Sequence, residues 1–510
     1  MSPAPVNPLV QVSKVLQPNA TVPLPEKVAV LQTFATTLQG NLPMERSVQI
    51  LSAVPLGLFY HGFSVEDDKL TAVLCELIQK ILSPFTFEHV MSEENKPFLL
   101  QGLTHFTPEI RYLSIQQVFK CLSSDASVAM MVESDVFPLI LVSIAFQDTR
   151  TANKASELLY KMSSMPSGLE AFFGPTCTMM LKQLLSVNGT ISFRVYDLII
   201  KVATLSDETF KKSEDSGLLL EFTKELQSKD LLVKINAIEL LNEIATTPAG
   251  LVFLEKADLL ESISAVLDNP NDNDVVVALV KCAVIKFFGN LGENKTIQFE
   301  PMSVKYHILE RLEKCLDSTE TEILMVTVSS VGLIGSHLAG LEQISNQQSL
   351  LEKFFEIYES SVGPIKGVFL QSLSKLISVR GDNEHVEKLT LDIFKRIQGR
   401  PSTLTSLIKE AKQPEESVRV ASFALMQAIA YHAWGSQLMA QSNEFMNYIL
   451  NRSTEYTEQG QTWKYAIIQT LASAPDASHI FKEYYAQLVV YIRQGAYFRP
   501  LEAIAAVESS

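Results

Sequence analysis

Apolar residues recur at helical spacing in the middle of the chain, where the segment VKINAIELLNEIA carries one apolar stripe on one helix face. Asp230 precedes this stripe as the expected N-cap, and Pro248 and Gly250 interrupt the pattern after it. Two shorter amphipathic segments follow, and a second long apolar helix begins near Val275. Since no single helix buries its apolar face alone, the pattern predicts an array of packed helices.

The same pattern recurs along the chain. Aligned on Ala237, with a leucine four residues later and Ile–Ala at seven and eight, equivalent residues lie 40 to 53 positions apart. The anchors are Leu74, Ile115, Ala155, Val195, Ala237, Val284, Thr327, Phe369, Ser422 and Lys464. The string MPSGL at 165–169 also reappears as TPAGL at 247–251, with weaker versions at Gly340 and Gly435.

A period of roughly 40 to 47 residues is typical of armadillo and HEAT repeats. The sequence therefore predicts an all-α, armadillo/HEAT-type helical repeat solenoid (an α-α superhelix) of about ten units. The alternative is an irregular all-α domain whose helices recur by chance, and the regular spacing of the earlier anchors disfavours it.

The domain organisation follows from the prolines. Residues 1–25 hold six prolines and predict a mobile tail without a helix, and residues 26–510 predict a single solenoid. A first helix is expected from about Glu26 to Leu38, followed by an atypical capping segment and by regular repeats from about Ser64. Pro43, Pro55, Gly57 and Gly62 mark the capping segment. The longest spacing falls at 399–414, where Pro401 and Pro414 bracket a short helix.

Composition narrows the class of partner. The chain is 47% apolar and carries a formal charge of −15, so a nucleic acid is not expected to bind it. We find no uninterrupted apolar run of membrane-spanning length and no secretory signal at the start, and expect a protein of the cytosol or nucleus that binds no membrane. The five cysteines form no CxxC pair and are expected to be reduced core residues.

The sequence contains none of the common catalytic, metal-binding or phosphate-binding motifs. The eight histidines form no i,i+4 pair and no HExxH, and the chain has no GxxxxGK[ST] loop and no GxSxG elbow. The glycine-rich 289–292 closes a helix, so its amides point the wrong way for phosphate. We therefore predict no enzyme, no metal and no cofactor; the alternative is a divergent hydrolase or glycosylase on a helical-repeat scaffold.

One charged pattern accompanies the anchors. An acidic residue two positions after the anchor and a lysine six positions after it give three expected i,i+4 pairs, which are Glu76–Lys80, Glu157–Lys161 and Asp197–Lys201. Such pairs stabilise an exposed helix, and they also predict a charged ladder on the inner wall of a solenoid, where partners bind. We expect reversal of Lys161 and Lys201 to Glu to weaken partner binding and to leave the melting temperature almost unchanged.

The apolar stripe of the central long helix predicts a core role for Phe287 and Phe288. Gly289 is expected to let a neighbouring helix approach closely. Truncation of a fully buried Phe288 to Ala should cost about 3–5 kcal/mol.

Four strings resemble the 26S proteasome non-ATPase regulatory subunit 5 family, in the family's order and spacing. They are SFRVYDLII at 192–200, IKFFGNL at 285–291, VGLIGS at 331–336 and the closing Gly495-x-Tyr497-Phe498-x-Pro500. The resemblance covers about residues 26–506. It implies an armadillo-like chaperone for assembly of the proteasome regulatory-particle base.

The resemblance also implies the partners. Such a chaperone would hold an ATPase subunit, namely regulatory subunit 7 in a module with regulatory subunit 4 and non-ATPase subunit 2, and leave before the proteasome matures. The alternative is an armadillo-type adaptor for transport or other scaffolding. Import adaptors line their groove with repeated Asn and Trp, whereas Trp434 and Trp463 are the only tryptophans of this chain. Its residues at the Asn position are Lys161, Lys201, Glu243 and Asn290, so only one of these four is Asn.

Overall fold

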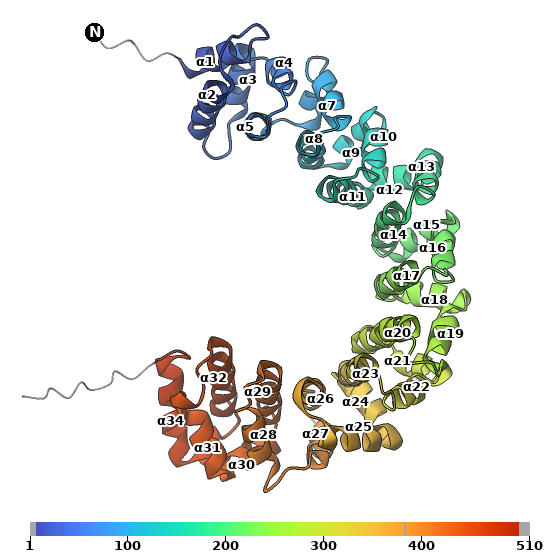
Figure 1. The fold of residues 1–510 in the computed structure, drawn as a ribbon, viewed down its shortest axis with the longest axis vertical. Coiled ribbons are helices and arrows are strands. Elements are labelled where there is room, and N and C mark those ends of the chain that lie inside the picture. Colours follow the sequence, from blue (N-terminus) through green and yellow to red (C-terminus); the bar gives the residue numbers. More distant parts are fainter. Residues whose placement is uncertain (1–6, 382–383, 499–510) are drawn as a thin grey trace, which may run out of the picture. The chain divides into compact units, whose positions relative to one another are not determined.

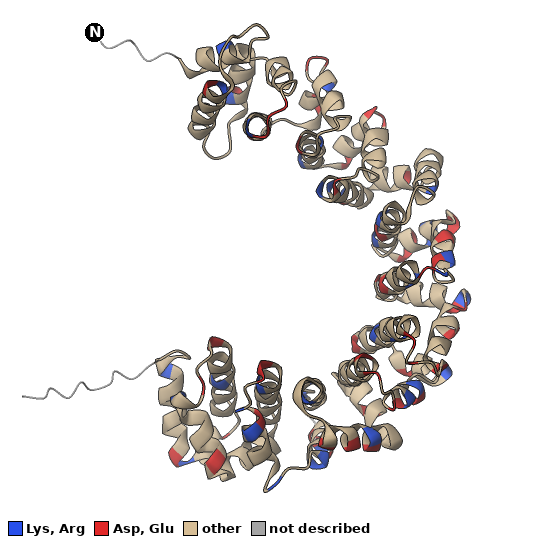
Figure 2. Ribbon diagram, viewed as in Figure 1, with Lys and Arg blue, Asp and Glu red and all other residues tan. Residues whose placement is uncertain are grey.

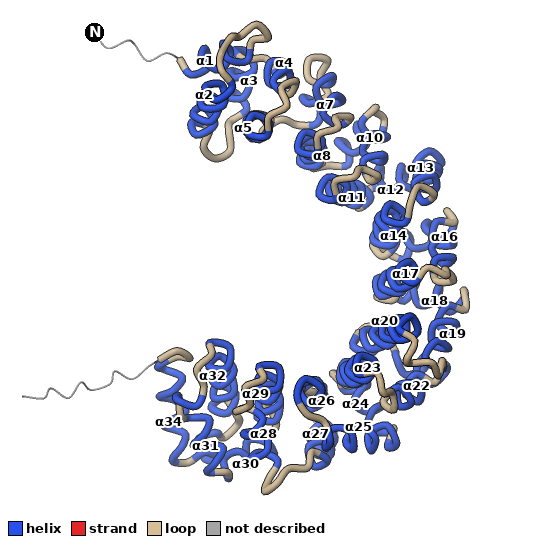
Figure 3. Tube along the Cα trace, in the orientation of Figure 1, coloured by secondary structure: helices blue, strands red, loops and turns tan. Residues whose placement is uncertain are grey.

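The computed structural model describes residues 7–381 and 384–498, and these form 34 α-helices, two short 3-10 helices and no strand. Short loops join the helices throughout (Figure 3). The chain divides into two compact units, Met1–Glu225 and Leu226–Ser510, which are described separately. The predicted all-α class is confirmed. That all the repeats form one continuous solenoid stays a prediction.

In the first unit, each long helix packs on the next to form one row, and the shorter helices lie behind that row (Figure 1). The row consists of α2 (Leu24–Thr37), α5 (Asp68–Ile81), α8 (Pro108–Cys121), α11 (Thr149–Ser163) and α14 (Gly189–Ala203). The others are α1 (Pro8–Leu16), α3 (Met44–Ala53), α4 (Leu56–Gly62), α6 (Phe87–Val90), α7 (Lys96–Leu103), α9 (Asp125–Val132), α10 (Val136–Ser143), α12 (Pro166–Phe172), α13 (Pro175–Leu185), α15 (Asp207–Asp215) and α16 (Leu218–Glu225).

The second unit repeats this arrangement. Its row consists of α17 (Leu231–Ile244), α20 (Val275–Glu293), α23 (Thr321–Ile334), α26 (Gly363–Ile377), α29 (Glu416–Ala430) and α32 (Glu458–Ala472). The others are α18 (Pro248–Lys256), α19 (Leu259–Ser264), η1 (Ala265–Asp268), α21 (Phe299–Lys305), α22 (Ile308–Cys315), α24 (Leu338–Asn346), α25 (Gln348–Ser360), α27 (Glu384–Arg396), α28 (Thr403–Glu410), α30 (Ala433–Gln441), α31 (Asn443–Leu450), η2 (Arg452–Thr454), α33 (Ala477–Phe481) and α34 (Glu483–Gln494).

The ten anchors lie in ten successive long helices, from α5 to α32, so the predicted repeat is confirmed. Most of these helices begin at a cap seven residues before the anchor. Asp230 is such a cap, and its carboxylate accepts hydrogen bonds from the amides of Leu232 at 2.9 Å and Val233 at 3.3 Å. Asp67 and Asp148 cap α5 and α11 in the same way. The caps satisfy amides that a helix start leaves without partners.

The glycine that recurs after four of the long helices has a packing role. Gly168, Gly250, Gly340 and Gly435 each lie directly against a backbone carbonyl in the last turn of the preceding long helix, which leaves no room for a Cβ. The chain can therefore turn sharply from the long helix into the next short one. This close approach explains why MPSGL and TPAGL resemble each other.

The centre of the second unit is closely packed. Phe287 and Phe288 are 0% exposed, as predicted. Gly289 lies against α23, where a Cβ would come within 2.8 Å of the Ser330 Cβ and 3.1 Å of its Cα. Gly332 makes the same kind of contact with Ser372 on α26. Three successive long helices thus approach each other through a glycine and a serine.

The start of the chain differs from the prediction. The expected helix-free tail is wrong for α1, whose Val12, Val15 and Leu16 are buried. Pro8 is the first residue of α1, where its missing N–H costs nothing, and the side chain of Asn7 caps the helix. Residues 1–6 of that tail lie outside the described part of the chain.

Pro43 and Pro55 stand at the N-caps of α3 and α4, and a capping role for this segment stays a prediction. The short helix predicted between Pro401 and Pro414 is confirmed as α28. The first helix of the solenoid, expected from Glu26, begins two residues earlier at Leu24.

One helix is long and strongly apolar. By length and composition α20 could cross a membrane, but Lys281 and Lys286 interrupt its apolar residues, so the prediction that no uninterrupted apolar run reaches that length is confirmed. In the structure, 56% of its apolar window is buried, and α20 packs between α17 and α23 as a core helix. The α9–α10 pair passes the same test only when the two helices are counted together, and they meet at 87°.

The cysteines are unpaired and largely buried, as predicted for reduced core residues. Burial raises the pKa of Cys177 to about 12 and that of Cys315 to about 11, so both thiols stay protonated near neutral pH.

Candidate partner-binding surface

The six residues of the predicted ladder lie on the long-helix row of the first unit. Glu76 and Lys80 are on α5, Glu157 and Lys161 on α11, and Asp197 and Lys201 on α14. Two of the three expected ion pairs form, with Lys80 Nζ 2.6 Å from Glu76 Oε1 and Lys201 Nζ 2.8 Å from Asp197 Oδ2. Partner binding by the ladder stays a prediction.

The third expected pair does not form. Glu157 accepts instead from Lys154, one turn earlier on α11, at 2.8 Å. The ammonium of Lys161 donates to the backbone carbonyl of Phe119 at 2.8 Å, so it is directed to the neighbouring helix α8 and away from Glu157. The sequence could not show this competing acceptor, because it belongs to the preceding repeat.

The sixth position after the anchor serves the scaffold. Lys80 donates to the Ala35 carbonyl at 3.0 Å, just as Lys161 donates to that of Phe119. Cys121, at the same repeat position, lies with its Sγ 3.3 Å from the Phe85 carbonyl. Lys80 and Lys161 each satisfy a carbonyl in the last turn of the preceding long helix, whereas Cys121 contacts a carbonyl of the loop after α5. Of the three ladder lysines, Lys201 is the most exposed, with 46% of its side chain accessible.

Cations of one long helix in this row contact aromatic rings of the preceding long helix. The guanidinium of Arg150 lies 4.0 Å from the ring centre of Tyr112, and the ammonium of Lys154 lies 3.6 Å from that of Phe119. Both rings belong to α8 and both cations to α11. The sequence analysis missed these residues, because the paired ring lies about one repeat away. Aromatic residues of one long helix followed one repeat later by Lys or Arg would have been the signal.

A hollow of about 440 Å³ separates α11 from α14. It is lined by Asn153, Ser156, Glu157, Tyr160, Arg194, Asp197, Leu198 and Lys201, which include three of the six ladder residues. The guanidinium of Arg194 is held in place by two hydrogen bonds, which it donates to the Phe146 carbonyl at 2.9 Å and to the Thr149 hydroxyl at 3.2 Å. The hollow therefore presents polar and charged groups of both signs.

A second hollow, of about 1030 Å³, lies at the end of the second unit beside α34. Arg452 donates to the Gly495 carbonyl at 2.9 Å, and its guanidinium lies 3.5 Å from the ring centre of Tyr491. The exposed Tyr456, Val490 and Phe498 surround the hollow. Of the closing motif, Pro500 lies outside the described residues.

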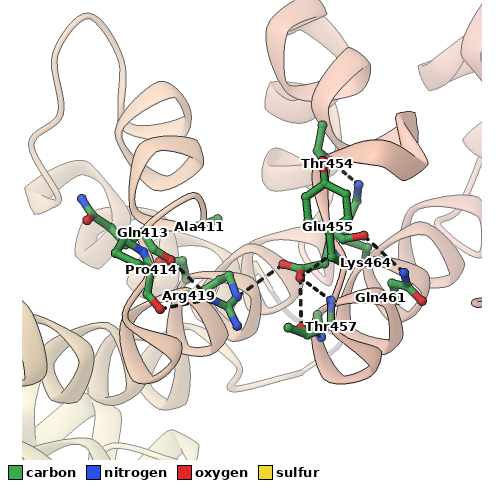
Figure 4. Close-up of polar contacts among 12 residues, drawn as sticks. Ala411, Gln413, Pro414, Arg419, Thr454, Glu455, Thr457, Gln461 and Lys464 are labelled. Atoms are coloured by element: carbon green, nitrogen blue, oxygen red, sulfur yellow. Dashed lines mark hydrogen bonds and ion pairs between the residues drawn. The ribbon is translucent and has the colours of Figure 1, made fainter.

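A buried charged cluster forms one wall of this second hollow (Figure 4). Lys464, only 1% exposed, donates to the Asn451 carbonyl and the Thr454 hydroxyl, each at 2.6 Å, and to the Tyr448 carbonyl at 3.2 Å. Arg419 reaches across from α29 to the buried Glu455 carboxylate, at 3.4 Å. Burial lowers the pKa of Lys464 to about 7, against the opposing effect of Glu455. Its partners make Lys464 a structural support for the end of α31.

Within the described residues, no group of three or more His, Cys, Asp and Glu side chains could hold a metal ion. Two of the histidines, His337 and His432, have hydrogen bonds to backbone carbonyls of neighbouring helices. His337, for example, caps α24 and contacts the Gly292 carbonyl at 2.7 Å.

The comparison with known families decides the kind of repeat protein. A family model described as proteasome non-ATPase 26S subunit matches residues 11–510. The chain belongs to this family. The 26S proteasome non-ATPase regulatory subunit 5 of Bos taurus is 24% identical over 490 residues, covering 94% of this chain and 96% of the relative. The Homo sapiens protein of that name is 24% identical over 491 residues with the same coverage.

The family resemblance predicted from four short strings is thus confirmed. The relative from Drosophila melanogaster, also named regulatory subunit 5, is 21% identical over 452 residues, covering 85% of this chain and 84% of the relative. The long helices that carry the repeat, α5 to α32, thus span most of the part of this chain that aligns with its relatives.

Solved structures confirm the fold class of this family member. Yeast importin-beta (Kap95p) aligns with a TM-score of 0.57 and 11% identity, over 95% of this chain and 65% of that one. Kap95 in a complex with Nup1 gives a TM-score of 0.60 at the same identity and coverage. At this identity the likeness shows a helical repeat solenoid and nothing about partners.

Proposed function

We propose that this protein is a chaperone for assembly of the base of the 26S proteasome regulatory particle. It binds an ATPase subunit through its helical-repeat surface and is absent from the mature proteasome. The match of the proteasome non-ATPase family over residues 11–510 carries this proposal, together with relatives named regulatory subunit 5 along almost their whole length. As the resemblance implies, the ATPase partner is regulatory subunit 7, with regulatory subunit 4 and non-ATPase subunit 2 in the same module.

Such a protein works by binding and not by catalysis, in the cytosol or nucleus. The long-helix row of the first unit supports this proposal, because α5, α11 and α14 carry the charged ladder residues that a folded partner could contact. The six ladder residues are its first binding candidates, with Lys201 the best placed because of its exposure. Purified protein is expected not to turn over ATP; turnover abolished by one point mutation would contradict the proposal.

The transport-adaptor alternative loses support from one side chain. Trp434 is not presented in a groove for basic peptides; its ring stacks on the buried His432 at 5.4 Å, and its indole N–H donates to Thr390 at 3.4 Å. Trp434 is thus part of the packing between α27 and α30.

Affinity purification with mass spectrometry tests the proposed function. Tagged protein should recover ATPase subunits of the base without the proteolytic core subunits, because a chaperone leaves before the particle is complete. Recovery of complete proteasomes would indicate a permanent subunit, and recovery of import cargo would favour the adaptor; either result contradicts the proposal. A tagged, unrelated helical-repeat protein serves as the control for non-specific capture.

A further inference from the structure

Positive charge is concentrated on three neighbouring long helices of an acidic protein. Together α8, α11 and α14 contain seven Lys and Arg against three Asp and Glu, a formal +4, while the whole chain carries −15. We call these seven cations the basic face: Arg111, Lys120, Arg150, Lys154, Lys161, Arg194 and Lys201. Figure 2 shows their colour along the long-helix row of the first unit. Directly behind this row, α15 and α16 are acidic.

Two cations of the basic face are crowded together. The ammonium groups of Lys154 and Lys161 lie 3.6 Å and 4.4 Å from the centre of the same ring, that of Phe119. Glu157 pairs with Lys154 and not with Lys161. Burial lowers the pKa of Lys161, and the charge of Lys154 lowers it further. An added anion at this point would relieve the repulsion between the two ammonium groups.

The three arginines of the basic face are held in place before any partner binds. The guanidinium of Arg111 lies 4.1 Å from the ring centre of Phe146, and Arg194 is bonded to the backbone carbonyl of the same residue. Arg150 is fixed against Tyr112. Because these side chains are already ordered, binding an anion costs less conformational entropy than it would with free lysines.

The hollow between α11 and α14 sets the size of the ligand. Its volume of about 440 Å³ accepts a few side chains and not a folded domain. Asn153, Ser156 and Tyr160 add uncharged hydrogen-bonding groups to Arg194 and Lys201 on its wall. The net charge of −15 repels a long polyanion, whereas a short acidic segment meets the local excess of cations on α8, α11 and α14.

We infer that the basic face binds a short acidic polypeptide segment of the partner, rich in Asp and Glu, with side chains entering the hollow between α11 and α14. The identity of the partner rests on the proposed function; the acidic chemistry rests on the structure alone. Glu157 and Asp197 also line the hollow, and they are already paired with Lys154 and Lys201. Because their negative charges repel further carboxylates, they limit the number of acidic side chains that can enter the hollow.

Fluorescence anisotropy with a labelled ten-residue Glu/Gly peptide tests the inference on the full chain. The variant Arg150→Gln/Lys201→Gln removes two exposed cations from α11 and α14. It should bind the peptide about tenfold more weakly, and the affinity of the wild type should fall with added salt. The control Lys69→Gln/Lys211→Gln removes the same charge from exposed positions on α5 and α15 and should bind like the wild type. Arg150→Lys/Lys201→Arg keeps the charge and should also retain binding.

Equal loss in both Gln variants would overturn the inference, because attraction would then be non-specific. A labelled single-stranded RNA that binds the wild type more tightly than the peptide would overturn it in favour of a nucleic acid. If Arg150→Gln/Lys201→Gln still captures base ATPase subunits as well as wild type does, the inference fails and the proposed function stands. If the peptide result holds but no ATPase subunit is captured, the proposed function fails and the acidic-segment site stands.

Discussion

Lys464 occupies the anchor position of the last long helix, where the nine other repeats carry an uncharged side chain. Its ammonium is buried and donates to backbone carbonyls at the end of α31 and to the hydroxyl of Thr454. The sequence placed Lys464 correctly on a repeat position. It could not show the acceptors, which come from the short helix and loop before α32.

Stability should depend on pH through Lys464. Its folded-state pKa of about 7 lies below the usual 10.5, so between these values the unfolded chain binds more protons and stability rises with pH. The variant Lys464→Met keeps the length of the side chain and removes the titration. Urea unfolding should show the wild type gaining stability relative to Lys464→Met from pH 7 to pH 9, by at most about 1.4 kcal/mol per pH unit. A difference that stays constant with pH would contradict this prediction.

The ladder lysines Lys161 and Lys201 should differ in their contribution to the free energy of unfolding. Lys161→Met removes the hydrogen bond to the Phe119 carbonyl and should lower the free energy of unfolding by about 1 kcal/mol. Lys201→Met, on the exposed side of α14, should change it by no more than about 0.5 kcal/mol. Chemical denaturation measures both. This revises the expectation that reversing Lys161 leaves the melting temperature unchanged, and equal effects of the two variants would restore it.

Helix positions were largely readable from the sequence, while contacts between helices were not. Periodicity located the long helices, and Asp230 was recognisable as a cap because capping is local. The fold of 8–16 into α1 was missed because Pro8 stands at the first helical position, where a proline does not break the helix. The Glu157–Lys154 pair and the rings beneath Arg150 and Lys154 were missed because they depend on the neighbouring repeat.

The contact of α20 with α23 can be tested at Gly289. Gly289→Ala places a Cβ within 2.8 Å of the Ser330 Cβ, so the two helices must separate, and stability should fall by about 1–3 kcal/mol. Gly189→Ala is the matched control, since a Cβ there meets no atom within 4 Å and Ala favours the helix. Thermal unfolding followed by circular dichroism measures both variants. A loss at Gly189 as large as that at Gly289 would show that the close approach is not the cause.

The two compact units, 1–225 and 226–510, each have a row of long helices and a buried core of their own. Because repeats interact mainly with their neighbours, each unit should fold without the other. Separately expressed fragments divided after Glu225 should both show helical circular dichroism and a cooperative thermal transition. The repeat pattern could not have predicted this division, since it continues from Val195 to Ala237 without a change in spacing. A fragment that lacks a cooperative transition would show that its core depends on the other unit.

The division also predicts where the acidic peptide binds. All seven cations of the basic face, the rings of Tyr112, Phe119 and Phe146, and the hollow between α11 and α14 belong to the first unit. The folded fragment 1–225 should therefore bind the labelled Glu/Gly peptide with an affinity within about twofold of the full chain, since all residues of the site belong to the first unit. Fragment 226–510, measured by anisotropy under the same conditions, should bind it at least tenfold more weakly, about the effect of losing one close charge pair. If 1–225 is folded by circular dichroism and yet loses the peptide, the acidic segment must be held by residues outside the basic face.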